Sequence, residues 1–96
     1  MPYTPQQNRA RVTALLDEVR DRITTLPSTD WDGELNYAIS YLVATTMKPA
    51  TGWRYHWLHR AYGVFMAAGA EFNRRLMGPY EDKAIEKNGD IPPYES

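Results

Sequence analysis

Residues 58–76, LHRAYGVFMAAGAEFNRRL, contain the strongest periodic pattern in this chain. Apolar residues recur there at alternating steps of four and three, at Leu58, Tyr62, Phe65, Gly69, Phe72 and Leu76. This spacing places them on one face of a long helix and gives it an apolar seam. The small residues between them would let another helix approach closely. Such a seam can pack within the chain or against a second copy, and the sequence leaves both possibilities open.

Two shorter amphipathic patterns precede the seam. The first is expected to begin near Pro5, with Thr4 as the N-cap and a capping-box glutamine three residues later, and to end at Pro27. The second is expected to run from about Asp32 to Met47, where a Pro/Gly turn follows. No alternating pattern is long enough to predict a strand.

Gly78 and Pro79 interrupt the long third pattern. Pro79 can break or kink that helix, or open a short fourth helix that closes at Asn88 and Gly89. Residues 1–4 and 90–96 are expected to be extended. The sequence therefore predicts a single all-α domain over residues 1–96, a small bundle of three helices plus a short C-terminal fourth helix.

The composition sets limits on the class of protein. Ninety-six residues form one small domain of marginal stability, so association with a partner is a serious expectation. The net charge of −1 argues against a surface that as a whole seeks nucleic acid or membrane lipid. The absence of cysteine suits a reducing cytoplasm, and no apolar run approaches the roughly 18 residues of a membrane span. We expect a cytoplasmic protein without a membrane partner.

Residues 53–62, WRYHWLHRAY, are the best candidate for binding a ligand or a partner. Arginine and aromatic rings are the residue types that pair with phosphates and stack on bases. The candidate residues are Trp53, Arg54, Tyr55, Trp57, His59 and Arg60. The alternative, which we favour, is that Trp57 and Tyr62 pack inward while the arginines are solvated or paired.

His56 and His59 have a spacing that could place two imidazoles on one metal ion. No third ligand can be assigned from the sequence, and a histidine near a helix start is ordinarily a surface residue. We therefore predict no metal and no cofactor. No pair of acids has a spacing that fixes it in one cleft, so we predict no catalytic residue and a protein that is not an enzyme.

A charged cluster surrounds the interruption at Gly78. Glu71 lies three and four residues before Arg74 and Arg75, a spacing that predicts ion pairs within one helix. Acids that follow Pro79 could clamp the next segment back onto these arginines. We expect the cluster to belong to a structural polar network that holds the bundle closed and comprises Glu34, Asn36, Tyr37, Glu71, Arg74, Arg75, Tyr80, Glu81 and Asp82.

Four motifs occur in a fixed order: the opening MPY, ELNYAI at 34–39, EFNRR at 71–75 and PYEDKAIEKNGD at 79–90. Together they resemble a family of short proteins of tailed-bacteriophage genomes that read ELNY, E-aromatic-x-RR, PYED and NGD, over about two-thirds of the chain. The resemblance implies a phage-encoded accessory protein acting in a bacterial cytoplasm, and it implies no reaction. The chain departs from the family pattern at Asn73, where a tyrosine is usual, and in its tryptophan-rich segment.

Two functional readings follow. The first is a non-enzymatic, homo-oligomeric binding module that associates with itself and with a host or phage protein. The second is a small-ligand binder of nucleotide type, or one that contacts nucleic acid, using Arg54, Arg60, Arg74 or Arg75 with nearby aromatic rings. A hydrolase that uses carboxylates and a metal is less favoured than either.

Overall fold

The computed structural model describes residues 3–94, and every regular element in that range is helical. The α-helices are α1 (Ala10–Thr24), α2 (Trp31–Met47), α3 (Tyr55–Phe72) and α4 (Gly78–Asn88). Short 3-10 turns occur at Gln6–Asn8, Ser28–Asp30 and Pro92–Tyr94, and a π turn, η3, occupies Asn73–Met77. The all-α prediction is confirmed. Within the described range no helix combines the length and apolarity that crossing a membrane requires.

The start of the first helix differs from the prediction. Thr4 makes no side-chain cap, and a 3-10 turn precedes α1, which begins only at Ala10. Instead, the backbone carbonyl of Thr4 accepts a hydrogen bond from the Arg9 guanidinium, at 2.9 Å. At the other end, Pro92–Tyr94 form a 3-10 turn, so an extended tail is wrong there. Residues 1–2 and 95–96, also predicted to be extended, lie outside the described residues.

Helices α1 and α2 form a hairpin that is fixed by its connecting turn. The hydroxyl of Thr25 donates to the Arg22 carbonyl at 2.6 Å as α1 ends, and Pro27 then opens the turn. Trp31, the first residue of α2, donates from its indole N–H to the Leu26 carbonyl at 3.0 Å. Its half-buried ring therefore lies between the two helices, as expected for a residue that fills the space at a helix junction.

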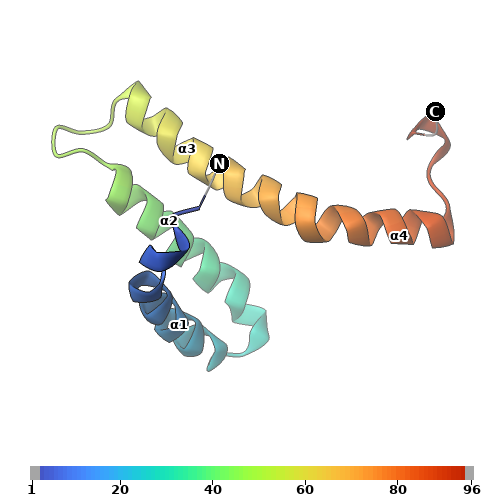
Figure 1. Ribbon diagram of the computed structural model, residues 1–96, viewed down its shortest axis with the longest axis horizontal. Helices are drawn as coiled ribbons and strands as arrows, with labels where there is room; N and C mark the ends of the chain where they lie inside the picture. The colour runs from blue at the N-terminus through green and yellow to red at the C-terminus, as the bar shows by residue number, and fades with distance from the viewer. Residues whose placement is uncertain (1–2, 95–96) are drawn as a thin grey trace.

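The helical path continues from α3 through the π turn and past Pro79 into α4. Because proline has no N–H, an ordinary α-helical bond is lost at this position. The π turn accommodates the change: the Gly78 N–H donates to the Asn73 carbonyl, five residues back. A Cβ on Gly78 would lie 3.1 Å from that oxygen, so glycine suits the turn. Helix α4 thus extends α3 end to end (Figure 1) and stops at Asn88, before a glycine at φ 86°.

The predicted closed bundle is wrong. Successive hairpins pack α1 on α2 and α2 on α3, while α4 projects away from the other helices as an arm (Figure 1). The Cα radius of gyration is 17.8 Å, against about 12 Å for a compact chain of this length. Within residues 3–94 only Ile23 and Ala61 are buried. The chain is an open zigzag of helices, and we call Gly78–Asn88 the arm.

Candidate functional site

Glu71 is the centre of a three-residue ion cluster at the C-terminal end of α3. Its carboxylate accepts two hydrogen bonds from Arg74, with Nη2 to Oε1 at 2.7 Å and Nε to Oε2 at 3.4 Å. The Nε of Arg75 also donates to Oε1. These pairs have the i,i+3 and i,i+4 spacing from which the sequence predicts ion pairs. Both arginines therefore form ion pairs within their own helical segment and stabilise it locally.

The electrostatics of the cluster follow from these bonds. The hydrogen bond from Arg74 is the largest of the effects that together lower the pKa of Glu71, and the same bond raises the pKa of Arg74. The Glu71 side chain is 29% exposed, whereas both guanidinium groups lie mostly in solvent. Glu71 is thus held as a carboxylate and is a poor proton acceptor at neutral pH.

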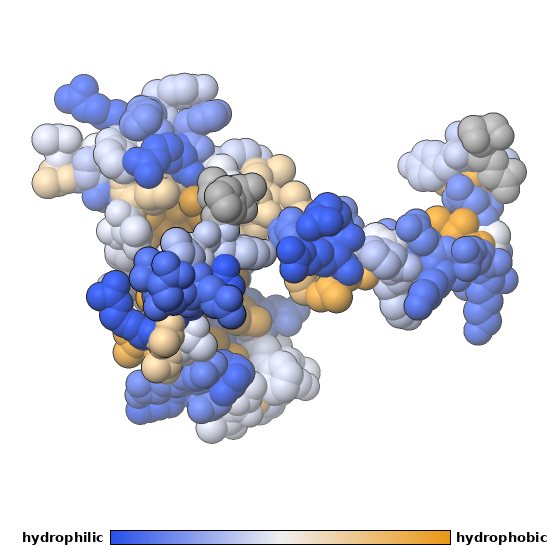
Figure 2. Space-filling model, in the orientation of Figure 1, coloured by the Kyte–Doolittle hydropathy of each residue, from blue (hydrophilic) through white to orange (hydrophobic). Residues whose placement is uncertain are grey.

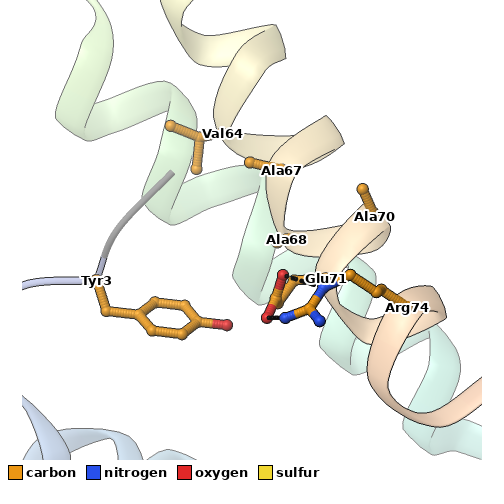
Figure 3. Close-up of a pocket in the computed structure, with 7 residues that line it drawn as sticks. All are labelled: Tyr3, Val64, Ala67, Ala68, Ala70, Glu71 and Arg74. Atoms are coloured by element: carbon orange, nitrogen blue, oxygen red, sulfur yellow. Dashed lines mark hydrogen bonds and ion pairs between the residues drawn. The ribbon is translucent and has the colours of Figure 1, made fainter.

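A shallow hollow of about 300 Å³ lies beside this cluster. Its lining comprises Tyr3, Val64, Ala67, Ala68, Ala70, Glu71 and Arg74. Figure 3 shows the Tyr3 hydroxyl directed toward the Glu71–Arg74 pair from the N-terminal segment. The Arg9 guanidinium stands 5.9 Å from the centre of the Tyr3 ring. The small alanine side chains leave space between Tyr3 and α3, and the Tyr3 ring occupies the edge of this hollow.

Tyr3 is a residue that the sequence analysis missed as part of a site. It is more than sixty positions from Glu71, and no periodic pattern links the two. The one available signal is its place in the MPY opening, which belongs with the motifs that include EFNRR. Its position therefore depends on how the N-terminal segment crosses toward α3.

The aromatic and basic residues of the 53–62 segment do not converge on one cleft. Trp53 lines an apolar hollow of about 250 Å³ between α2 and α3, while Tyr55 stacks on His59 at 5.8 Å between ring centres. The Arg60 guanidinium stands 4.6 Å from the centre of the Trp57 ring. Arg54 immediately precedes α3 and is exposed. Their contacts are mainly local, along one helix.

The expected inward packing of two rings from this segment is only partly found. Trp57 is half-buried, but Tyr62 is 65% exposed, so its predicted burial is wrong. Tyr62 lines the shallow hollow between α2 and α3 together with Ala61, and α2 covers the small Ala61 side chain but only part of the Tyr62 ring. His56 meets the edge of Trp57, with ring centres 5.5 Å apart. Within residues 3–94 no three His, Cys, Asp or Glu side chains form a group that could hold a metal ion.

The wider polar network predicted around Glu71 does not assemble. On α2, Asn36 accepts a hydrogen bond from Ser40 at 3.1 Å and Tyr37 stacks on Tyr41 at 5.9 Å, both within the helix. Tyr80 is 75% exposed on the arm. In the described part of the chain no polar side chain is buried and the recorded ion pairs do not include Glu34, Glu81 or Asp82. The reason is geometric, because the arm points away from α2.

A second surface feature is an apolar groove of about 220 Å³ between α1 and α2. We define the α1–α2 groove by Leu16, Val19, Ile23, Leu35, Ile39 and Leu42. These residues lie in the two amphipathic patterns that precede the seam, and no sequence pattern predicts the groove between them as a site. Of the six, only Ile23 is buried.

The helices and these surfaces define an all-α protein whose open arrangement leaves several apolar faces uncovered. The chain belongs to the family described as Domain of unknown function (DUF6899), whose family model matches residues 1–91. Comparison with curated proteins and with solved structures gave no significant match.

Proposed function

We propose that this chain is a non-enzymatic helical binding module that works as a homo-oligomer. One observation supports the proposal above others: the chain exposes 8732 Å² of accessible surface. A compact monomer of 11.1 kDa exposes about 5,700 Å². In a dimer this excess of about 3,000 Å² per chain amounts to about 6,000 Å² in total, at or above the upper end of the about 2,000–5,000 Å² that obligate interfaces bury, so the chain has ample surface for such an interface.

The seam of the third helix contributes to this excess. Its members Leu58, Tyr62, Phe65, Phe72 and Leu76 are exposed in the single chain. Burial of apolar area contributes about 25 cal/mol per Å² before the costs of association. A surface of this kind favours association over a free monomer.

The non-enzymatic part of the proposal rests on the state of the acids. Glu71 is bound by two guanidinium groups, which suits a fixed charge better than a proton acceptor. Glu81 and Asp82 lie beyond the π turn on the arm. A pair of acids that works on one substrate needs to converge on one cleft, and the arm carries Glu81 and Asp82 away from the helical hairpins (Figure 1).

We further propose a biological setting from the motif pattern. The ELNY, E-aromatic-x-RR, PYED and NGD motifs resemble a phage family, which supports an accessory protein acting in the cytoplasm of a bacterial host. In that setting the oligomer would bind a host or phage protein. The resemblance is the sole support for this part.

A second candidate function is binding of a nucleotide-type ligand. The observation in its favour is the Arg60 guanidinium over Trp57 beside the exposed Arg54, a combination that can stack on a base and meet a phosphate. Arg74 and Arg75 are weaker candidates because both already pair with Glu71. A thermal-shift screen with mono-, di- and cyclic nucleotides tests this candidate, and Arg60→Ala should abolish any rise in melting temperature.

The mass of the protein in solution tests the main proposal. Light scattering coupled to gel filtration should give a multiple of 11.1 kDa, and the melting temperature should rise with protein concentration. Tyr62→Asp on the seam should shift the protein toward monomer. Tyr37→Asp is a matched control, because Tyr37 is similarly exposed but lies on α2, outside the seam. A mass of one chain at every concentration would refute the proposal.

A further inference from the structure

The seam continues onto the arm, and this line of side chains is largely uncovered. Tyr80 follows Leu76 by one helical turn, so it extends the seam past the π turn. The five large side chains of the seam and Tyr80 are between 39% and 75% exposed. Figure 2 shows the arm standing clear of the helical hairpins. An isolated helix of 11 residues is marginal in water, so the arm lacks the packing that normally stabilises such a helix.

The uncovered area is close to what a stable interface needs. A side chain of this size has about 200 Å² of accessible area, so these six leave about 700 Å² exposed per chain. A specific interface buries about 800 Å² on each partner. The apolar hollow between α2 and α3 lies beside the first half of the seam, because Leu58, Tyr62 and Phe65 also line it. A helix that lies on the seam would therefore cover this hollow as well.

The seam is symmetric about Gly69. Tyr62 and Leu76 lie seven residues from it in either direction, and Leu58 and Tyr80 lie eleven residues from it. In the described part of the chain, a Cβ added to Gly69 would meet nothing within 4 Å, so packing within the chain gives no reason for a residue that weakens a helix interior. A seam of this kind fits a copy of itself that runs in the opposite direction and approaches closely at the glycine.

Charge favours the antiparallel direction for that copy. Residues 35–70 have no acid, and their bases are Lys48, Arg54 and Arg60. Residues 76–94 are acidic overall, with Glu81, Asp82, Glu86 and Asp90 against Lys83 and Lys87. Among the described residues, no recorded ion pair includes any of these groups. An antiparallel copy brings these opposite net charges together, whereas a parallel copy would place each region against its own kind.

We propose that two copies of this chain pair antiparallel along the seam, with their helices crossing near Gly69 and the arm of each copy lying over the first half of the other's α3. This rests on the proposed homo-oligomer and names its interface. The same surface serves both copies, so the pairing closes with two-fold symmetry and gives a dimer. Residues 71–75, which carry the ion cluster, would then face residues 63–67, which carry no charge.

Cross-linking between two singly substituted chains tests the direction of the pairing. The chain has no cysteine, so Tyr62→Cys and Leu76→Cys each add the only thiol. The two positions lie about 20 Å apart along one helix. When the two variants are mixed, unfolded, refolded together and treated with a short bis-maleimide, a 62–76 product with the mass of two chains should form. Neither variant alone should give such a product.

A matched control and the remaining outcomes decide the test. Arg74 lines the hollow beside Tyr3, away from the seam, so Arg74→Cys should cross-link to Tyr62→Cys at least tenfold less than Leu76→Cys does. A dominant 62–62 product would mean that the seams pair in parallel and would overturn the inference. If light scattering finds an oligomer and no 62–76 product forms, the antiparallel seam is refuted while the homo-oligomer stands; a monomer refutes both.

Two glycines of α3 give an independent readout. Gly69→Glu should weaken dimerisation at least tenfold by sedimentation, because it places two carboxylates in an apolar contact where the helices cross. Gly63→Glu is the matched control: Gly63 also lies inside α3 with nothing within 4 Å of an added Cβ, but it is outside the seam. It should leave the dimer dissociation constant within about twofold. Equal dissociation constants for Gly69→Glu and the unsubstituted protein would contradict the inference.

Discussion

Ile23→Ala should be the most costly truncation of an aliphatic side chain in α1. Ile23 is 9% exposed and faces α2 from the groove. Replacing it with alanine removes three carbon groups, which is about 2.4 kcal/mol of transfer free energy at about 0.8 kcal/mol each. The cavity term should be small because the groove is open on one side. We therefore expect a loss of about 2–3 kcal/mol in the free energy of unfolding.

Thermal unfolding followed by circular dichroism measures this loss. For a domain of this size, each kcal/mol shifts the melting temperature by about 4–8 °C, so a fall of about 10–20 °C is expected. Leu15→Ala is the matched control: Leu15 lies on the same helix at 65% exposure and should change the free energy of unfolding by about 0.5 kcal/mol or less. If both variants lose equal stability at the same low protein concentration, α1 packs on α2 through a different face.

Three further predictions concern the turn, the ion cluster and the hairpin. Gly33→Ala should raise stability by about 0.5–1 kcal/mol, whereas Gly78→Ala should give no such gain in the same urea titration, because its Cβ would crowd the Asn73 carbonyl. The pKa of Glu71 is lowered in the folded state, so its stabilisation is present above the usual glutamate range and disappears as the pH falls through the folded pKa. Melting temperatures measured against pH should fall less steeply on acidification in Glu71→Gln, and an unchanged slope would contradict this role. Trp31→Phe should cost about 1 kcal/mol in urea unfolding through loss of its indole hydrogen bond, and an unaltered midpoint would show that the bond contributes nothing.

The positions of the helices were largely accessible from the sequence, because they depend on neighbours a few residues apart. Helix α2 begins at Trp31 and ends at Met47, and α4 ends at Asn88 before a glycine with positive φ, close to the predicted bounds. Periodicity and helix-ending residues report local backbone preferences. The predicted start of α1 was wrong because the Thr4 carbonyl accepts a hydrogen bond from Arg9, and the Thr4 hydroxyl does not cap the helix.

Some contacts of the candidate site could likewise be predicted from the sequence, and others could not. The contacts of Glu71 with two arginines follow from i,i+3 and i,i+4 spacing, since a helix places such residues side by side. The approach of Tyr3 to this pair could not be derived from spacing, because it depends on the path of a distant segment. The wider polar network that the sequence predicted does not form, because it required α4 to pack against α2.

By itself, the sequence determined that this chain is helical, where most of its helices begin and end, and which charges pair within a turn. The tertiary structure decided that the helix runs on through Pro79, that the arm projects away from the hairpins, and that the seam and the α1–α2 groove remain uncovered. The physical reason is the separation along the chain of the residues that each kind of interaction joins. Helical hydrogen bonds and neighbouring ion pairs join residues within about five positions, whereas burial depends on which distant surfaces meet.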